Sequence, residues 1–209
     1  MSERGADPAA LYQSLYRSGV GDVVAVANRI EDAAWERPAC GQWTATETAH
    51  HLLAVTDWYH AWLERSLRGE LDPPFQVGEM DRQNELAKAA YTTLDGPSAI
   101  TAFAERADQY LAAASPHWDR SFAFPYGVVT VGAHVGVAAS EWQVHAWDLS
   151  TVTDTRHVPE DPAAVFAAVA AGLAMAQGGI RGSVTAAVLP VVTMYKPWES
   201  LLRRSGRTP

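Results

Sequence analysis

Cysteine is almost absent from this sequence: Cys40 is the only one among 209 residues. An internal disulfide is therefore excluded, and so is a structural zinc site built from several thiolates. A single unpaired cysteine suits a reducing compartment, and residues 1–8 are polar and lack the apolar segment of a secretion signal. We therefore expect a cytoplasmic protein.

Positive charge and long apolar runs are also scarce. Lysine and arginine number 16 against 24 aspartates and glutamates, so that the formal net charge is −8. Phosphate binding needs a basic surface, and this balance argues against nucleic acid as a partner. No run of about 18 apolar residues is present, which predicts that no helix spans a membrane. The composition, 48% hydrophobic and 19% charged, is that of a globular chain with one sizeable core.

Apolar residues recur at steps of three and four through most of the chain, which indicates amphipathic helices. In the helix that follows Trp43, Thr44 is the predicted N-cap and Glu47 completes a capping box. Gly96 and Pro97 interrupt the pattern, which allows either two helices or one kinked helix there. The predicted helices cover residues 8–34, 45–68, 78–93, 98–114, 130–150, 161–177 and 196–204.

Two short segments do not fit the helical pattern. Residues 121–127 alternate briefly and predict an extended piece or a loop, and 185–192 form a β-branched run of uncertain state. The remainder predicts an all-α fold: a four-helix bundle over residues 1–157 and a helical extension, 158–209, packed on the same domain. Helical bundles often pair through their exposed faces, which makes a homodimer the oligomer to test.

The stretch 140–149 carries the strongest chemical signal. Glu141 and His145 are four apart on a predicted helix, so their side chains stand on one face and can share a metal ion. Asp148 lies near that face and can orient a ligand from behind. The alternative is an ordinary Glu–His contact on a solvated face, but Trp142 and Trp147 crowd the pair.

A third ligand has to come from another helix. His51 shares a stripe with Val55, Trp58 and Trp62, and it is either a ligand or a core histidine with a hydrogen-bond partner. The adjacent His50 falls on a different stripe and is expected at the surface.

Other polar residues are weaker candidates for site residues. His134 stands seven residues before Glu141, hence on the same face, and is a reserve ligand. Arg82 is expected to be solvated, and Cys40 lies in a connector, where a structural or incidental role is expected.

His51, Glu141 and His145 supply two imidazoles and one carboxylate. Such a set is typical of catalytic metal sites, because it leaves one coordination position open for water or substrate. It suits Zn²⁺, and also Fe²⁺ or Ni²⁺. The long gap between His51 and Glu141 matches no compact metal motif, so the spacing alone does not decide between a site and separate contacts.

These segments resemble a known family. Residues 43–52, Trp-Thr-Ala-Thr-Glu-Thr-Ala-His-His-Leu, resemble the tryptophan-to-histidine motif of the DinB-like superfamily. Residues 141–149, in the order Glu-x-x-x-His-x-Trp-Asp-Leu, resemble the second motif of its mycothiol-dependent maleylpyruvate isomerase branch. Residues 126–127, 198–202 and 206–209 are similar to segments of many actinobacterial members.

The resemblance implies a DinB-like four-helix bundle in which His51, Glu141 and His145 bind zinc or another divalent ion. It also implies mycothiol, a cysteine-containing sugar thiol, as co-substrate, and an electrophilic small molecule as its partner in the reaction. The chain departs from the isomerase after residue 157, where that enzyme has an α/β domain with an important arginine. This departure argues against maleylpyruvate itself as the substrate.

The function expected from the sequence is a metal- and mycothiol-dependent S-transferase or isomerase. One alternative keeps the metal but uses bound water for hydrolysis. Another is a metal-binding bundle without catalysis. An aromatic wall from Trp58, Trp62 and Trp142 would favour a bulky organic substrate, although each of these residues also suits a core.

Overall fold

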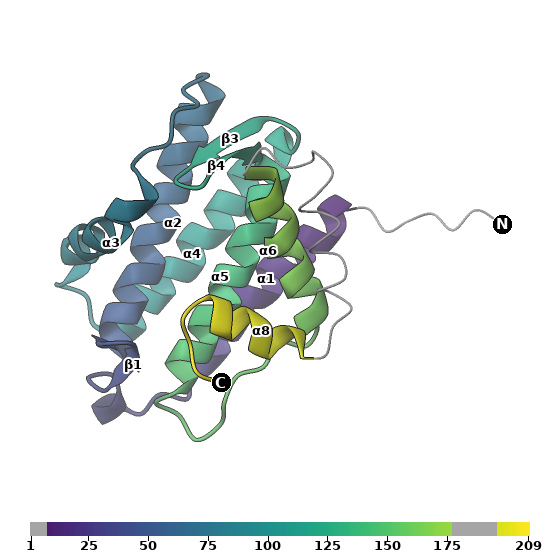
Figure 1. Ribbon diagram of the computed structural model, residues 1–209. Helices are drawn as coiled ribbons and strands as arrows, with labels where there is room; N and C mark the ends of the chain where they lie inside the picture. The colour runs from purple at the N-terminus through teal and green to yellow at the C-terminus, as the bar shows by residue number, and fades with distance from the viewer. Residues whose placement is uncertain (1–7, 177–195) are drawn as a thin grey trace.

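The computed structural model describes residues 8–176 and 196–209 and is largely helical (Figure 1). Four long helices form the bundle, with α1 packed along α5 and α2 along α4. Their bounds are α1 Pro8–Ala27, α2 Ala45–Leu67, α4 Gly96–Ala114 and α5 Val131–Ser150. The all-α fold predicted from the sequence is confirmed.

The C-terminal helices cover one side of this bundle. Helix α6 (Pro162–Ala176) packs against α5, and α8 (Pro197–Arg204) contacts α6. Figure 1 shows α8 and the tail after it lying near the end of α5. The chain therefore returns to the bundle at its C-terminus.

Short elements connect the helices. Helix α3 (Met80–Lys88) lies beside α2, and two antiparallel hairpins pair β1 (Pro38–Cys40) with β2 (Trp43–Thr44) and β3 (Ser121–Phe124) with β4 (Gly127–Thr130). The second hairpin runs in the register Ser121↔Thr130 to Phe124↔Gly127. Single 3₁₀ turns complete the set: η1 Asp32–Ala34, η2 Val77–Glu79, η3 Ala89–Tyr91 and η4 Ser115–His117.

Most helix boundaries follow the sequence patterns, with one difference, and the choice left open at Gly96 is decided. The first helix ends at Ala27, short of the predicted residue 34, because the chain turns there and lets Trp35 pack into the core. The segments before and after Gly96 are separate helices, since Asp95 caps α4 by accepting a hydrogen bond of 2.8 Å from the Ser98 backbone N–H.

The extended piece expected near residues 121–127 is real and forms the β3–β4 hairpin, whose turn uses Gly127 at φ 134°. The β-branched run 185–192 lies outside the described residues. Among the helices described, none combines the length and apolar character needed to cross a bilayer.

Glycine allows the close approach of α1 to α5. A Cβ at Gly19 would lie 2.9 Å from Trp142 Cβ and 3.1 Å from the carbonyl oxygen of Ala139. Trp142 is fully buried and packs edge-on against Tyr16 and Phe103. The indole therefore cannot move aside, and its place in the core excludes it from the aromatic wall expected from the sequence.

We predict opposite effects for two alanine substitutions in α1. Gly19→Ala forces α1 and α5 apart and should lower the free energy of unfolding by about 1–3 kcal/mol. Gly21→Ala, in the same helix, meets nothing within 4 Å and should raise it by about 0.4–1 kcal/mol. Urea unfolding of both variants measures the difference, and equal effects would contradict this account of the helix contact.

Candidate metal centre

Capping interactions set the start of the two helices that carry the candidate ligands. Thr44 Oγ1 accepts a hydrogen bond from the Glu47 backbone N–H at 3.1 Å, and the Glu47 carboxylate accepts one from the Thr44 N–H at 2.9 Å. Thr130 caps α5, because its Oγ1 accepts a hydrogen bond from the Ala133 backbone N–H at 3.1 Å. The predicted capping box is thus present, and it fixes where α2 begins.

His51 from α2 meets Glu141 and His145 from α5. His51 Nε2 lies 3.7 Å and His145 Nε2 lies 3.3 Å from the same oxygen, Glu141 Oε1. One ligand atom from each residue falls within 4.8 Å of the others. Bonds of about 2.0–2.2 Å to a tetrahedral Zn²⁺ leave neighbouring ligand atoms roughly 3.4 Å apart, so the three residues fit a divalent ion.

The charge states of His51 and Glu141 suit ligation. Burial lowers the pKa of His51, which keeps its imidazole neutral, and His51 Nδ1 is buried without a hydrogen-bond partner. Burial alone would raise the pKa of Glu141, but hydrogen bonds with His145 and His51 hold it well below its usual range. A neutral imidazole and an ionised carboxylate are the forms that bind a metal.

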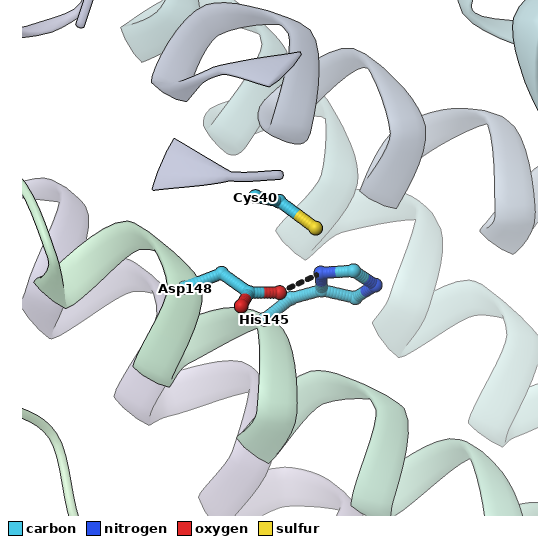
Figure 2. Close-up of side chains that lie close together, drawn as sticks. All are labelled: Cys40, His145 and Asp148. Atoms are coloured by element: carbon cyan, nitrogen blue, oxygen red, sulfur yellow. Dashed lines mark ion pairs between the residues drawn. The ribbon is translucent and has the colours of Figure 1, made fainter. Parts of the chain in front are cut away.

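A second cluster supports His145 from behind. Asp148 Oδ2 lies 2.9 Å from His145 Nδ1, and Figure 2 shows this ion pair beside the Cys40 sulfur. Burial would lower the pKa of His145, but the Asp148 carboxylate, with Cys40 and Glu141, raises it well above its usual value. The contact turns the imidazole so that Nε2 faces Glu141, as the carboxylate behind a ligating histidine does.

Arg207 from the C-terminal tail completes this cluster. Its Nε donates to Asp148 Oδ1 at 3.1 Å, one terminal NH₂ donates to Asp148 Oδ2 at 2.7 Å, and that NH₂ lies 3.4 Å from Cys40 Sγ. The atoms of Cys40, His145 and Asp148 are also close enough to hold an ion. The guanidinium already supplies a positive charge there, so the trio with His51 and Glu141 is the better metal site.

A cleft of about 470 Å³ opens onto the three candidate ligands. Trp58 and Trp62 stack at 5.6 Å between ring centroids and form one wall, where Phe124 and Tyr126 also contribute. On the other side, the Trp43 ring lies 4.9 Å from the His51 ring. The site is thus a pocket whose lining combines several aromatic side chains with two imidazoles and a carboxylate.

Comparison with known families supports the resemblance found in the two motifs. A scan against protein families matches residues 16–150 to the mycothiol maleylpyruvate isomerase N-terminal domain. The chain belongs to this family. The match includes the three candidate ligands and Asp148, which confirms the resemblance stated from the two motifs. Searches of curated proteins and of solved structures find no match.

Other residues singled out in the sequence do not join the three candidate ligands. His134 is 1% exposed, pairs through Nδ1 with the Tyr110 hydroxyl at 2.8 Å and stacks on Phe122 at 3.9 Å. Burial lowers its pKa to about 3, so it is a neutral core residue. Arg82 is exposed, as expected, and pairs with Glu79.

One expectation about a neighbouring residue needs correction. His50 is buried rather than exposed, and its Nε2 lies 2.8 Å from the Leu94 carbonyl oxygen, because the chain before α4 covers that face of α2. Cys40, which the sequence placed in a connector, lines the cleft beside His145 and Arg207. Periodicity gave no signal for Arg207, because its partner, Asp148, lies 59 residues earlier.

We predict that Arg207 stabilises the fold through Asp148. Arg207→Met leaves a carboxylate that is 1% exposed without its guanidinium and should lower the free energy of unfolding by about 3 kcal/mol. Arg203→Met, on the exposed side of α8, is the matched control and should change it by less than about 0.5 kcal/mol.

A double-mutant cycle tests whether that loss runs through Asp148. Combining Arg207→Met with Asp148→Asn should be less damaging than the sum of the single changes by at least about 1 kcal/mol. Strict additivity in urea unfolding would show that the pair does not act as a unit.

Proposed function

We propose that the protein is a divalent-metal-dependent, mycothiol-dependent S-transferase or isomerase. The observation that carries the proposal is the convergence of His51, Glu141 and His145 at the base of an aromatic cleft, in a chain of a mycothiol-related family. Two imidazoles and one carboxylate leave a coordination position open, as catalytic sites require. Zn²⁺ is the first metal to test, with Ni²⁺ and Fe²⁺ after it.

When bound, the divalent ion supplies a Lewis acid that favours the thiolate form of the co-substrate. A free thiol with a pKa near 8.5 is only about 3% ionised at pH 7, so complete ionisation would raise the reactive fraction roughly thirty-fold. The protein's own residues supply the geometry. His51 and His145 hold the ion from two helices, and Asp148 keeps the His145 ring in place.

Glu141 acts in this proposal as a ligand and not as a proton donor. Its pKa is held well below the usual range, so the carboxyl group carries no proton near neutral pH. The proton of the thiol therefore passes to solvent through the open side of the cleft. The aromatic side chains Trp58 and Trp62 limit the access of water to the reacting carbon.

The reaction then forms one bond from sulfur to an electrophilic carbon. In S-transfer, the bond from that carbon to its leaving group breaks and the leaving group takes the electron pair. In isomerisation, the sulfur adds to a carbon–carbon double bond whose π electron pair moves to a conjugated carbonyl group. After rotation about the resulting single bond the double bond re-forms, the carbon–sulfur bond breaks and the thiolate is regenerated. Both outcomes use the same thiolate and the same cleft.

We predict that metal content depends on His51 and His145 but not on His60, which shares helix α2 with His51. By elemental analysis, the parent protein should retain close to one equivalent of metal, and His51→Ala and His145→Ala should each lose it. His60→Ala is the control, because His60 lies on α2 but its Nε2 pairs with the Arg106 carbonyl oxygen at 3.1 Å. Full metal retention in either ligand variant removes that residue from the site.

The same samples test the thiol. Mycothiol at 100 times its dissociation constant should stabilise the metal-loaded parent by about 2.7 kcal/mol, and it should give no stabilisation in the His51 and His145 variants. Turnover of an electrophile should require the thiol. Metal-dependent turnover that proceeds without any thiol would replace the proposal with hydrolysis, and metal binding without thiol binding would leave a non-catalytic metal-binding bundle.

A further inference from the structure

A second hollow adjoins the metal cleft, and its chemistry differs. This groove has a volume of about 570 Å³ and lies between the β1–β2 hairpin, the end of α5 and the C-terminal tail. It shares four lining residues with the cleft: Cys40, Trp43, Ser205 and Arg207. A ligand in the groove can therefore extend a short arm past these residues toward the three candidate metal ligands.

We propose that the groove binds the sugar body of the thiol co-substrate, while the aromatic end of the cleft binds an uncharged, apolar electrophile. This assignment rests on the proposed function, and it adds which surface takes which reactant. The sulfur of the thiol then lies at the junction of the two hollows, beside His51 and His145.

Matched charges suit the groove to a neutral, hydroxyl-rich ligand. Of its described lining residues, only Asp148 and Arg207 carry a full charge at neutral pH, and they pair with each other through two hydrogen bonds. A charged ligand would find no unmatched counter-charge among these lining residues, whereas hydroxyl groups require only neutral donors and acceptors. Thr151, Ser205 and Thr208 supply side-chain hydroxyls along the lining.

Trp147 gives the groove an apolar surface within this polar lining. Its ring is half-buried on α5, and the Arg156 guanidinium lies 5.5 Å from the ring centroid. An indole combines a large apolar face with little conformational entropy to lose, which suits contact with the C–H face of a sugar ring. Hydroxyl side chains and one aromatic face together match a sugar better than they match a peptide or a phosphate.

The aromatic end of the cleft has the opposite character. Trp58, Trp62 and Phe124 line it, and Asp81 places a carboxyl group in the same lining. Arg207 is the one Lys or Arg among the described lining residues, and its charge is matched by Asp148. Apart from the proposed ion, which the three ligands and the thiolate would coordinate, a dicarboxylate finds no unmatched cation here, while an uncharged aromatic electrophile gains apolar contact.

Transfer of the thiol to an uncharged test electrophile needs no further reactant. The thiolate sulfur attacks the chlorine-bearing carbon of 1-chloro-2,4-dinitrobenzene, and a carbon–sulfur bond forms. The carbon–chlorine bond breaks, chloride leaves with the electron pair, and the thiol proton has already passed to solvent. The products are the thioether, chloride and a proton, so no oxidant or reductant is needed.

The groove is tested by comparing two thiols, mycothiol and L-cysteine. Both carry a cysteine sulfur, but only mycothiol has a sugar body. Thr208→Trp fills the groove from an exposed position, and Trp147→Ala removes its aromatic face. By calorimetry with the zinc-loaded protein, each variant should bind mycothiol at least 10-fold more weakly and bind L-cysteine as the parent does. Val158→Trp, at an exposed site outside both hollows, is the matched control and should change neither affinity.

The aromatic end is tested with Trp58→Ala. This variant should raise KM for 1-chloro-2,4-dinitrobenzene at least 5-fold at saturating mycothiol and leave mycothiol affinity within 2-fold of the parent. Chloromaleate, a dianionic electrophile, should have kcat/KM at least 10-fold below that of the uncharged reagent with the parent enzyme, after correction for the uncatalysed rates.

The outcomes separate this inference from the function on which it rests. A parent protein that binds neither thiol when zinc-loaded overturns the proposed function and the groove assignment together. A parent that binds both thiols, with mycothiol affinity unchanged in both groove variants, overturns the groove assignment alone. Preference for chloromaleate, or an unchanged KM in Trp58→Ala, overturns the assignment of the aromatic end.

Discussion

A buried carboxylate that needs partners joins helix α5 to the C-terminal tail. Asp148 is 1% exposed, and an ionised group at such depth is stable only when opposite charges or donors surround it. Arg207 supplies two donors from the tail, and His145 supplies an imidazole from the same helix. The orientation of one candidate ligand therefore depends on a residue at the end of the chain.

This dependence explains why the C-terminal residues belong to the description of the site. The family match ends at residue 150, after the three candidate ligands, whereas Arg207 lies beyond it. Arg207 also lines both hollows beside the candidate metal ligands. The tail thus holds Asp148 and shapes the passage between a polar groove and an aromatic cleft.

The local chemistry of the site was largely accessible from the sequence. Glu141 and His145 are one helical turn apart, so any helix through them places both on one face. The capping box at Thr44 and Glu47 defined the start of α2 and hence the face that His51 presents. Short-range rules sufficed because each of these relations spans only a few residues along the chain.

Other features were decided by tertiary structure, because they join segments far apart in the sequence. His50 is buried by the chain before α4, and Trp142 belongs to the core because α1 approaches closely at Gly19. Cys40 lies beside His145 because β1 contacts α5. The sequence by itself determined an all-α bundle and the identity of three candidate ligands. Only packing between distant segments determined how His145 is supported, since burial and ion pairing depend on neighbours in space.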